Sequence, residues 1–143
     1  MLFVGIRVQK MNTLKLKNAF LNLCPYLRPM KLYGIPNCNT VKKARDWFKK
    51  HNVDYEFHNF KTEGITREKL AEWDSKAGLE KFLNKNSSTW KDLPPEVKEN
   101  VKTKDDAFNL IQEKTSMIKR PVVEKDGVLL FGFDESAYAK LIE

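Results

Sequence analysis

The sequence predicts an α/β protein with one four-stranded mixed sheet, in which a parallel βαβ half and an antiparallel ββα half are separated by a helical segment. Three observations predict this fold class. Strand-like apolar runs occur only near the two ends of residues 30–143, with helical patterns between them. The first two runs flank an amphipathic helical pattern, as a parallel crossover requires. The last two runs flank an Asp-Gly pair, which is typical of a tight hairpin.

The length and composition are those of a single globular domain. The chain has 143 residues, of which 41% are apolar, 11% aromatic and 31% charged. This apolar content is enough for a packed core, and the charged content argues against a membrane span or wholesale disorder. We therefore expect neither a membrane-spanning segment nor an extended low-complexity segment.

The net charge of +7 is concentrated near the N-terminus. Residues 1–29 contain five basic residues and no acidic one, whereas residues 30–143 contain 21 basic and 19 acidic residues. We expect residues 1–29 to be a basic extension, disordered or translated upstream of the native start, because Met30 directly precedes the first predicted strand. The extension does not suit a secretory signal, and it lacks the serines of a mitochondrial transit peptide. Residues 30–143 are expected to form the folded domain.

The first half of this domain contains two predicted strands around one helix. Residues 31–35 form a short apolar run that ends at turn residues, which predicts the first strand. A helix is expected next, capped by Thr40 and closed by His51 and Asn52. Apolar residues recur on one helix face: Val41, Ala44, Trp47 and Phe48. Residues 53–60 alternate between two faces and predict the second strand.

The second half is separated from the first by an all-helical insert over about 61–115. Its helices are expected at 66–77, 79–83, 94–101 and 105–111, with breaks at Ser87, Ser88, Pro94 and Pro95. Strands return at 120–124 and 128–131, joined by Asp126 and Gly127, and Asp134 caps a last helix. This order of elements is that of a thioredoxin-like fold with a helical insertion.

Cys38 is the first candidate functional residue. It lies in the turn between the first strand and the first helix, where the helix dipole and free N–H groups favour a thiolate, and Lys42 and Lys43 add positive charge. The alternative is a small buried apolar side chain. The chain has two cysteines and only Cys38 lies in residues 30–143, so we expect a reduced, cytoplasmic protein.

Arg120 and Pro121 form the second candidate. In a thioredoxin-like fold this proline would be cis and would face the Cys38 loop, leaving the preceding backbone free to pair with an extended peptide or glutathione. Arg120 would then bind an oxyanion or a carboxylate. The alternative is a solvated basic residue beside Lys119. Asn39 and Thr40, next to Cys38, complete the predicted anion-binding set.

No metal or bound cofactor is expected. The two histidines and Cys38 do not have the spacing of metal ligands. Basic residues of the insert alternate with acidic ones, which predicts a solvated face, so residues 30–143 are expected to bind neither nucleic acid nor membrane.

Residues 30–143 resemble the arsenate reductase (ArsC) family and its Spx and YffB-like relatives. Three segments carry the resemblance in order and spacing: LYGIPNCNTVKKA over 32–44, FLNKN over 82–86 and IKRPVV over 118–123. The first segment is most similar to the YffB-like branch. The resemblance implies a thioredoxin-like fold, a cytoplasmic location and, in the reductase, a thiolate that attacks arsenate and is discharged by glutathione and glutaredoxin. Cys38 matches this nucleophile and Arg120 matches one anion-binding arginine.

The departures from the family pattern change the expected chemistry. Where the reductase has two further arginines, this chain has Asn84 and either Gly132 or Phe133. Each lost charge-assisted hydrogen bond removes about 1.5–3 kcal/mol from an arsenate clamp. Val41 stands where a C-x-x-C switch of the redox-sensing Spx proteins has its second thiol. A lone thiolate instead suits a mixed disulfide with glutathione.

Three hypotheses result. The first is a glutathione-dependent thiol reductase that uses Cys38, with glutathione as co-substrate, glutaredoxin as a partner, and a small oxyanion such as arsenate as the less favoured substrate. The second is an Spx-like regulator that binds RNA polymerase without enzymatic activity, against which the missing second thiol counts. The third is nucleic-acid binding through the basic extension.

Overall fold

The structure is a computed structural model that describes residues 29–143. The predicted disorder or non-native origin of the basic extension therefore falls outside the described residues, apart from Pro29. Within the described part, no helix is both long enough and apolar enough to span a membrane.

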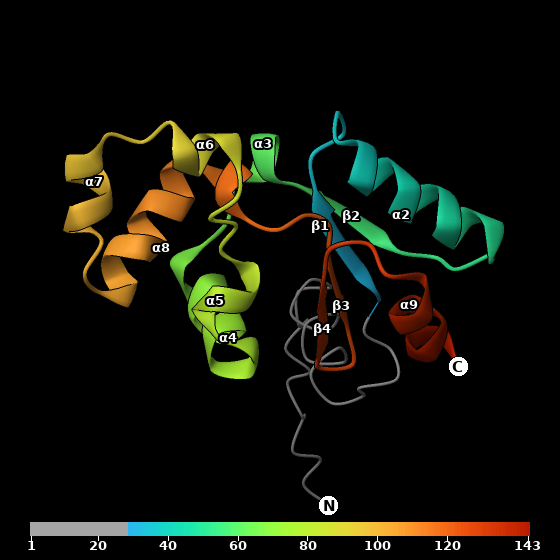
Figure 1. The fold of residues 1–143 in the computed structure, drawn as a ribbon. Helices are drawn as coiled ribbons and strands as arrows, with labels where there is room; N and C mark the ends of the chain where they lie inside the picture. Colours follow the sequence, from blue (N-terminus) through green and yellow to red (C-terminus); the bar gives the residue numbers. More distant parts are fainter. Residues whose placement is uncertain (1–28) are drawn as a thin grey trace, which may run out of the picture.

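The strands and helices follow the predicted order (Figure 1). In chain order they are β1 (Lys31–Gly34), α2 (Asn39–Lys50), β2 (Glu56–Asn59), α3 (Phe60–Glu63), α4 (Arg67–Ala77), α5 (Leu79–Phe82), α6 (Ser88–Lys91), α7 (Pro95–Asn100), α8 (Lys104–Glu113), the 3₁₀ helix η2 (Thr115–Met117), β3 (Val122–Lys125), β4 (Val128–Phe131) and α9 (Glu135–Ile142).

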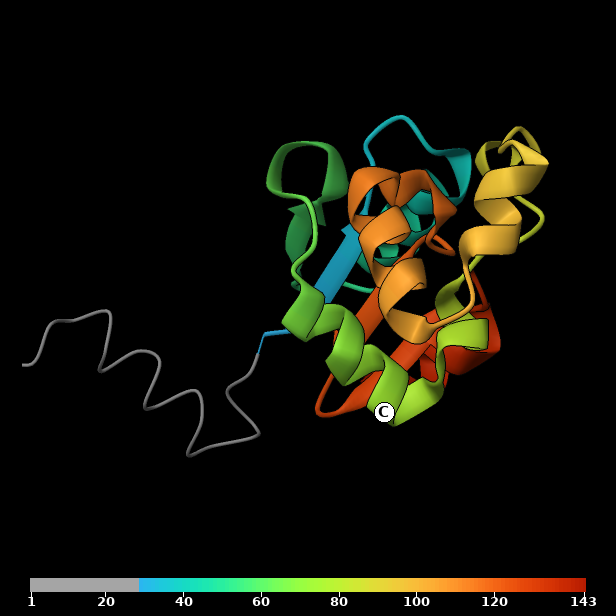
Figure 2. The ribbon, with the colours of Figure 1, turned by 90° about the vertical axis from the view of Figure 1, so that its left-hand side faces the viewer.

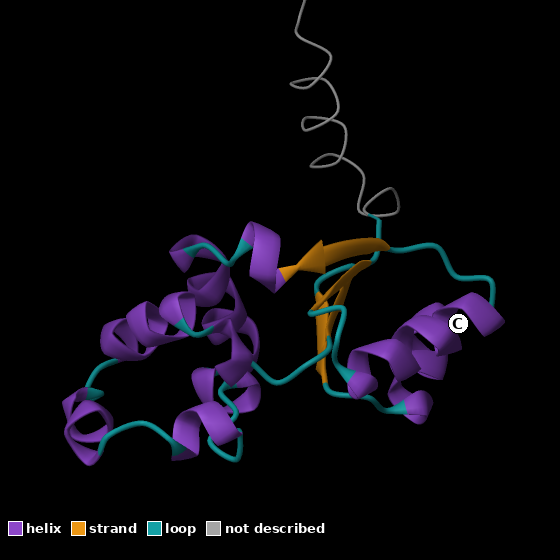
Figure 3. Ribbon diagram, turned by 90° about the horizontal axis from the view of Figure 1, so that it is seen from above, coloured by secondary structure: helices purple, strands orange, loops and turns teal. Residues whose placement is uncertain are grey.

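The strands form one mixed sheet in the order β2-β1-β3-β4. β1 is parallel to β2 and antiparallel to β3, and β3 is antiparallel to β4. Helices α2 and α9 lie on one face of the sheet, and the helical insert lies on the other (Figures 1 and 3). Seen from the insert side, α4 and α8 stand in front of the sheet (Figure 2). The predicted α/β, thioredoxin-like fold is confirmed.

Each face of the sheet has its own apolar core, because successive strand residues point to opposite faces. Leu32 of β1 and Val123 of β3 pack with the α2 and α9 side, whereas Tyr33 and Val122 pack with the insert. On the first side, Phe48 and Tyr138 stack with ring centroids 4.9 Å apart. On the insert side the buried aromatic residues include Phe60, Trp73, Phe82 and Phe108.

Helix α2 begins earlier than the sequence predicts. We expected Thr40 to be its N-cap, but Cys38 occupies that position with extended backbone, and Thr40 lies in the first turn. The prediction was wrong because the turn at Pro36 and Asn37 already reverses the chain, so the Cys38 carbonyl accepts a hydrogen bond from the Lys42 N–H at 2.9 Å. The end of the helix is as predicted, with His51 as its C-cap.

The second strand is shorter than predicted. β2 covers Glu56–Asn59 rather than residues 53–60. At its start, the Val53 N–H still bonds to the Phe48 carbonyl and Asn52 has a φ of 52°, so this part of the run closes α2 instead of pairing. At its end, Asn59 caps α3, which begins at Phe60.

The helical insert has the expected helices and further short ones. Thr66 caps α4 as predicted. We expected a break at Ser87 and Ser88. Ser87 lies outside the helices as predicted, but its hydroxyl accepts the Trp90 N–H at 3.1 Å and caps α6, which begins at Ser88. The prediction failed at Ser88 because serine both ends and starts helices.

The hairpin and the last helix agree with the predictions. Asp126 and Gly127 have φ values of 49° and 80°, the positive angles that a two-residue hairpin turn requires. The Asp134 side chain accepts hydrogen bonds from the Ser136 and Ala137 N–H groups and caps α9.

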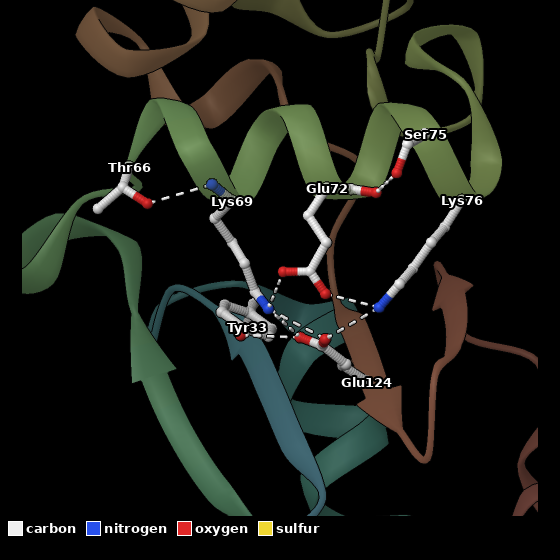
Figure 4. Close-up of polar contacts among 7 residues, drawn as sticks. All are labelled: Tyr33, Thr66, Lys69, Glu72, Ser75, Lys76 and Glu124. Atoms are coloured by element: carbon white, nitrogen blue, oxygen red, sulfur yellow. Dashed lines mark hydrogen bonds and ion pairs between the residues drawn. The ribbon is translucent and has the colours of Figure 1, made fainter. Parts of the chain in front are cut away.

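A charged cluster joins the insert to the sheet (Figure 4). The Lys69 ammonium of α4 lies 2.9 Å from the Glu124 carboxylate of β3 and 3.0 Å from Glu72. Lys76 lies 2.6 Å from Glu72, and the Tyr33 hydroxyl donates to Glu124 at 3.0 Å. Burial, together with the negative charge of Glu124, raises the pKa of Tyr33 well above its usual range. The cluster therefore ties α4 to both β1 and β3.

Candidate functional site

Sheet topology brings the Cys38 loop and the Arg120-Pro121 step to the same end of the sheet. β1 ends at Gly34 and β3 begins at Val122. These strands are antiparallel, with Tyr33 opposite Val122, so the residues that follow β1 lie beside those that precede β3. The Arg120–Pro121 peptide bond is cis, as predicted.

Cys38 lies at the start of α2, and its thiol is half-exposed. Its N–H donates to the Ile35 carbonyl at 3.4 Å, which closes the turn after β1. Its side chain makes no capping hydrogen bond, so it does not satisfy the first-turn N–H groups of α2. Those groups remain available to negative charge at this point. Among the described residues, Cys38 is the one free cysteine.

Asn39 and Thr40 lie in the first turn of α2, directly after Cys38. Asn39 is exposed and Thr40 half-exposed, so both side chains are open to a ligand at the thiol.

The next residue, Val41, is a packing residue. It is fully buried, and a Cβ built on Gly34 would lie 2.7 Å from its Cγ2. β1 and α2 therefore touch here, and the position of a second C-x-x-C thiol is filled by an apolar packing residue.

Arg120 is half-exposed, and its guanidinium makes no hydrogen bond or ion pair within residues 29–143. Its neighbour Pro121 is buried, and the Pro121 carbonyl accepts the Gly132 N–H at 2.8 Å. The Gly132 carbonyl in turn accepts the Tyr138 hydroxyl at 2.8 Å. Pro121 is thus held by the backbone while Arg120 remains available to a ligand.

Tyr138 is a supporting residue that sequence reasoning missed. It is fully buried, and this burial raises the pKa of its hydroxyl. In the sequence it has only the helical spacing of a core residue, so nothing there signals its hydrogen bond to the loop beside Pro121.

The third segment of the family pattern meets the second through backbone pairing. Leu83 and Ile118 form an isolated antiparallel bridge. The Asn84 N–H donates to the Met117 carbonyl and the Lys119 N–H donates to the Phe82 carbonyl, both at 2.7 Å. All three segments therefore border the same part of the molecule.

The positions that the resemblance matches to two further arginines, Asn84 and either Gly132 or Phe133, supply no cation here. Asn84 uses its side-chain oxygen to accept the Asn86 N–H at 3.1 Å. Gly132 lies beside Pro121 with a φ of 84°, a conformation that favours glycine. Among the matched positions, Arg120 is the one that holds an arginine.

No group of three or more His, Cys, Asp or Glu residues that could hold a metal occurs within residues 29–143.

Comparisons with known proteins agree with this arrangement. The model of the ArsC family matches residues 33–141. The solved structure of a YffB protein is 40% identical, covers 80% of this chain and 99% of its own, and superposes with a TM-score of 0.75. An arsenate reductase-related protein from Brucella melitensis is 38% identical, covers 82% of this chain and 97% of its own, and has a TM-score of 0.63.

A third relative is named a regulator. The global transcriptional regulator Spx from Streptococcus pyogenes serotype M3 is 30% identical over 106 residues, which are 73% of this chain and 78% of that protein. The family match thus runs from β1 into α9 and includes both the thiol loop and the cis-proline, and on this ground the chain belongs to the ArsC family.

Proposed function

We propose that this protein is a cytoplasmic, glutathione-dependent thiol reductase whose nucleophile is Cys38. The observation that carries the proposal is the placement of a half-exposed thiol at the N-cap of α2, at the end of the sheet where the cis Arg120-Pro121 step lies. The ArsC-family membership and the arsenate reductase-related neighbours support redox chemistry at this thiol.

The reaction needs one protein thiol and two glutathione sulfurs. The Cys38 thiolate attacks the glutathione sulfur of a mixed disulfide, forms a Cys38–glutathione disulfide and releases the substrate as a thiolate that takes up a proton from water. The thiolate of a second glutathione then attacks the glutathione sulfur on Cys38. Oxidised glutathione leaves and the Cys38 thiolate is restored, so the two electrons that reduce the substrate come from glutathione.

Single-thiol chemistry is supported by the surroundings of Cys38. Val41 is buried one turn along α2, so no second thiol at that position competes with glutathione for the mixed disulfide. A glutaredoxin could replace the second glutathione, because it carries the same kind of attacking thiol.

Arg120 has the role of binding a glutathione carboxylate. Its guanidinium has no partner within the described residues, and a fork of N–H donors suits a carboxylate. Arsenate is the less favoured substrate, since the resemblance matches Asn84 and either Gly132 or Phe133 to two arginines that would share its charge.

The decisive experiment is intact-mass spectrometry after incubation with oxidised glutathione. Wild-type protein and Cys24→Ser should each gain a glutathionyl group on Cys38, and reduced glutathione should remove it. Cys38→Ser combined with Cys24→Ser should gain none. An adduct on that double variant, or none on Cys24→Ser, would refute the proposal. A parallel incubation with arsenate and glutathione tests the oxyanion alternative.

Arg120→Ala should slow adduct formation by about tenfold to a hundredfold, as expected for one lost charge-assisted hydrogen bond of roughly 1.5–3 kcal/mol. Alkylation by neutral iodoacetamide should be unchanged. Lys119→Ala is the matched control, because Lys119 is an exposed neighbour with the same charge. An equal decrease in the rate of adduct formation in both variants would show that Arg120 has no specific role.

A second candidate is an Spx-like regulator that binds RNA polymerase. The similarity to proteins named as transcriptional regulators supports it, and Val41 in place of a second thiol counts against a redox-switched version. Retention of polymerase subunits by immobilised protein at physiological salt, with equal retention by Cys38→Ser, would favour this regulator over the reductase.

A further inference from the structure

Helix α2 has a larger net positive charge than residues 30–143 taken together. Residues 30–143 have a net charge of +2, but α2 alone has +4, so the remainder of these residues is net negative. The helix carries a single acidic residue, Asp46. Its basic residues are Lys42, Lys43, Arg45, Lys49 and Lys50.

These cations have no carboxylate partner among the described residues. All five are exposed, and none forms an ion pair within residues 29–143. The lysines of the insert behave differently, because Lys69, Lys76 and Lys104 each contact a carboxylate. These exposed charges are therefore free to interact with an anionic partner outside the chain.

Three of the cations line one groove beside the thiol loop. Lys42, Arg45 and Lys49 recur at i, i+3 and i+7 and so share a stripe of α2. They line an open groove of about 680 Å³ whose wall also includes Pro36 and Tyr55. Pro36 lies two residues before Cys38, and Lys49 lies roughly 16 Å further along the helix axis. The groove therefore leads away from the thiol along α2.

Arg45 is held in place within this groove. Its Nε donates to the Tyr55 hydroxyl at 3.2 Å, and its guanidinium lies 4.9 Å from the centroid of the Phe57 ring. Lys42 and Lys49 flank it with no partner in the described residues. The groove thus has one fixed cation between two free ones, and α2 itself lies on the side of the molecule away from the insert (Figure 1).

We propose that this cationic groove, lined by Lys42, Arg45 and Lys49, binds an acidic segment of a partner protein while a glutathionylated cysteine of that partner reacts with Cys38. The inference rests on the proposed thiol chemistry. In the reaction the glutathione sulfur passes from the partner cysteine to Cys38, and the partner leaves as a thiolate.

A protein fits the groove better than a nucleic acid. The thiol beside the groove needs a sulfur to react with, which nucleic acids lack. Asp46 and Asp54 also line the groove and reduce the net charge of its lining to +1, which disfavours a continuous phosphate backbone more than a segment with a few carboxylates. The groove also has an apolar wall that a peptide can cover, formed by Pro36, Val53 and Tyr55.

Two synthetic peptides of equal length test the proposal. Each carries one cysteine as its glutathione mixed disulfide, followed by spaced Glu residues in one peptide and Gln residues in the other. The Glu peptide should transfer glutathione to Cys38 about tenfold faster at low ionic strength, and added salt should remove the difference. Transfer is followed by intact mass in the Cys24→Ser background.

Lys49→Glu should reduce the rate with the Glu peptide about threefold, as expected for an exposed charge, and leave the Gln peptide and iodoacetamide rates unchanged. Lys49 is far enough from Cys38 to leave the thiol itself unaltered. Lys102→Glu makes the same charge change in the insert, between α7 and α8, and should have no effect.

A second readout does not depend on the thiol. Fluorescence anisotropy of a labelled, cysteine-free Glu peptide should show weaker binding to Lys49→Glu than to Lys102→Glu. Equal transfer rates for the two peptides, or equal binding to the two variants, would overturn the groove as a docking site. Stronger competition by a short DNA duplex than by the unlabelled Glu peptide would also overturn it, in favour of nucleic acid. Failure of oxidised glutathione to modify Cys38 would refute the proposed function together with the transfer step, whereas binding of the acidic peptide in the groove is judged separately by the anisotropy measurement.

Discussion

Gly34 is required by the close approach of β1 to the first turn of α2. An alanine Cβ there would lie 2.7 Å from one methyl group of Val41 and 3.1 Å from the other. Val41 is fully buried and cannot move aside freely. The contact holds the turn that carries Cys38 against the end of the sheet.

Gly34→Ala should therefore lower the free energy of unfolding by about 1–3 kcal/mol, the usual cost of overpacking. The measurement is urea-induced unfolding. In a Val41→Ala background the same change should cost less, because the methyl groups that clash are gone. An equal cost in both backgrounds would show that the contact with Val41 is not the cause.

Val41 also matters for the proposed thiol chemistry, because it stands where a second thiol would lie. In a Cys24→Ser background, Val41→Cys should convert the Cys38–glutathione adduct into an internal disulfide, since the new thiol lies one turn away on the same helix. Intact mass after oxidised glutathione should then show the loss of the glutathionyl group. Val41→Ser is the matched control and should keep the adduct. A stable adduct on Val41→Cys would contradict the prediction.

Helix α4 owes part of its attachment to the sheet to Glu72. Burial alone would raise the pKa of this carboxyl, but hydrogen bonds from Lys76 and Lys69 outweigh it and lower the pKa below its usual value of 4.5. Glu72 is partly exposed, so solvent screens much of this interaction and its contribution is small.

Because folding lowers the pKa of Glu72, part of the free energy of unfolding depends on pH. Above pH 4.5 Glu72 is ionised in both the folded and the unfolded chain, and its contribution is complete. As the pH falls, the unfolded chain takes up the proton first, and the contribution is lost as the pH passes through the folded pKa. Glu72→Gln should thus lower the unfolding free energy at neutral pH and show a smaller loss on acidification. Parallel curves for variant and wild type, by denaturant titration at several pH values, would contradict this.

At the scale of the whole molecule, Glu124 joins the two halves of the structure. It lies on β3, accepts a hydrogen bond from Tyr33 of β1 and pairs with Lys69 of the insert. Its side chain is 15% exposed, so water replaces these partners only in part.

Glu124→Gln should cost about 1–3 kcal/mol of stability, because Lys69 keeps its charge without its nearest partner. Hydrogen exchange should accelerate more in α4 than in α9, since α9 packs on the other face of the sheet. Glu99→Gln, in the exposed part of α7, serves as the control. Equal acceleration in α4 and α9 would indicate that Glu124 supports the sheet and not the docking of the insert.

The sequence predicts most elements correctly because periodicity and turn chemistry are local. The apolar spacing of α2, the Thr66 cap and the Asp126-Gly127 turn each depend on residues a few positions apart. The errors arise where local sequence is ambiguous. Thr40 and Ser88 are residue types that suit several positions around a helix end, and the turn geometry around them decides which position they take.

By itself, the sequence determined the family, the order of the elements and the thiol, since Cys38 and Arg120-Pro121 stand in recognisable segments. The tertiary structure alone decided what surrounds them. Three arrangements exist only once the sheet has formed. They are the cluster of Tyr33, Lys69 and Glu124, the contact of Gly34 with Val41, and the hydrogen bonds through which Gly132 and Tyr138 hold Pro121. Tyr33 and Glu124 are 91 positions apart, and no local pattern signals such a pair, because it exists only when β1 and β3 lie side by side.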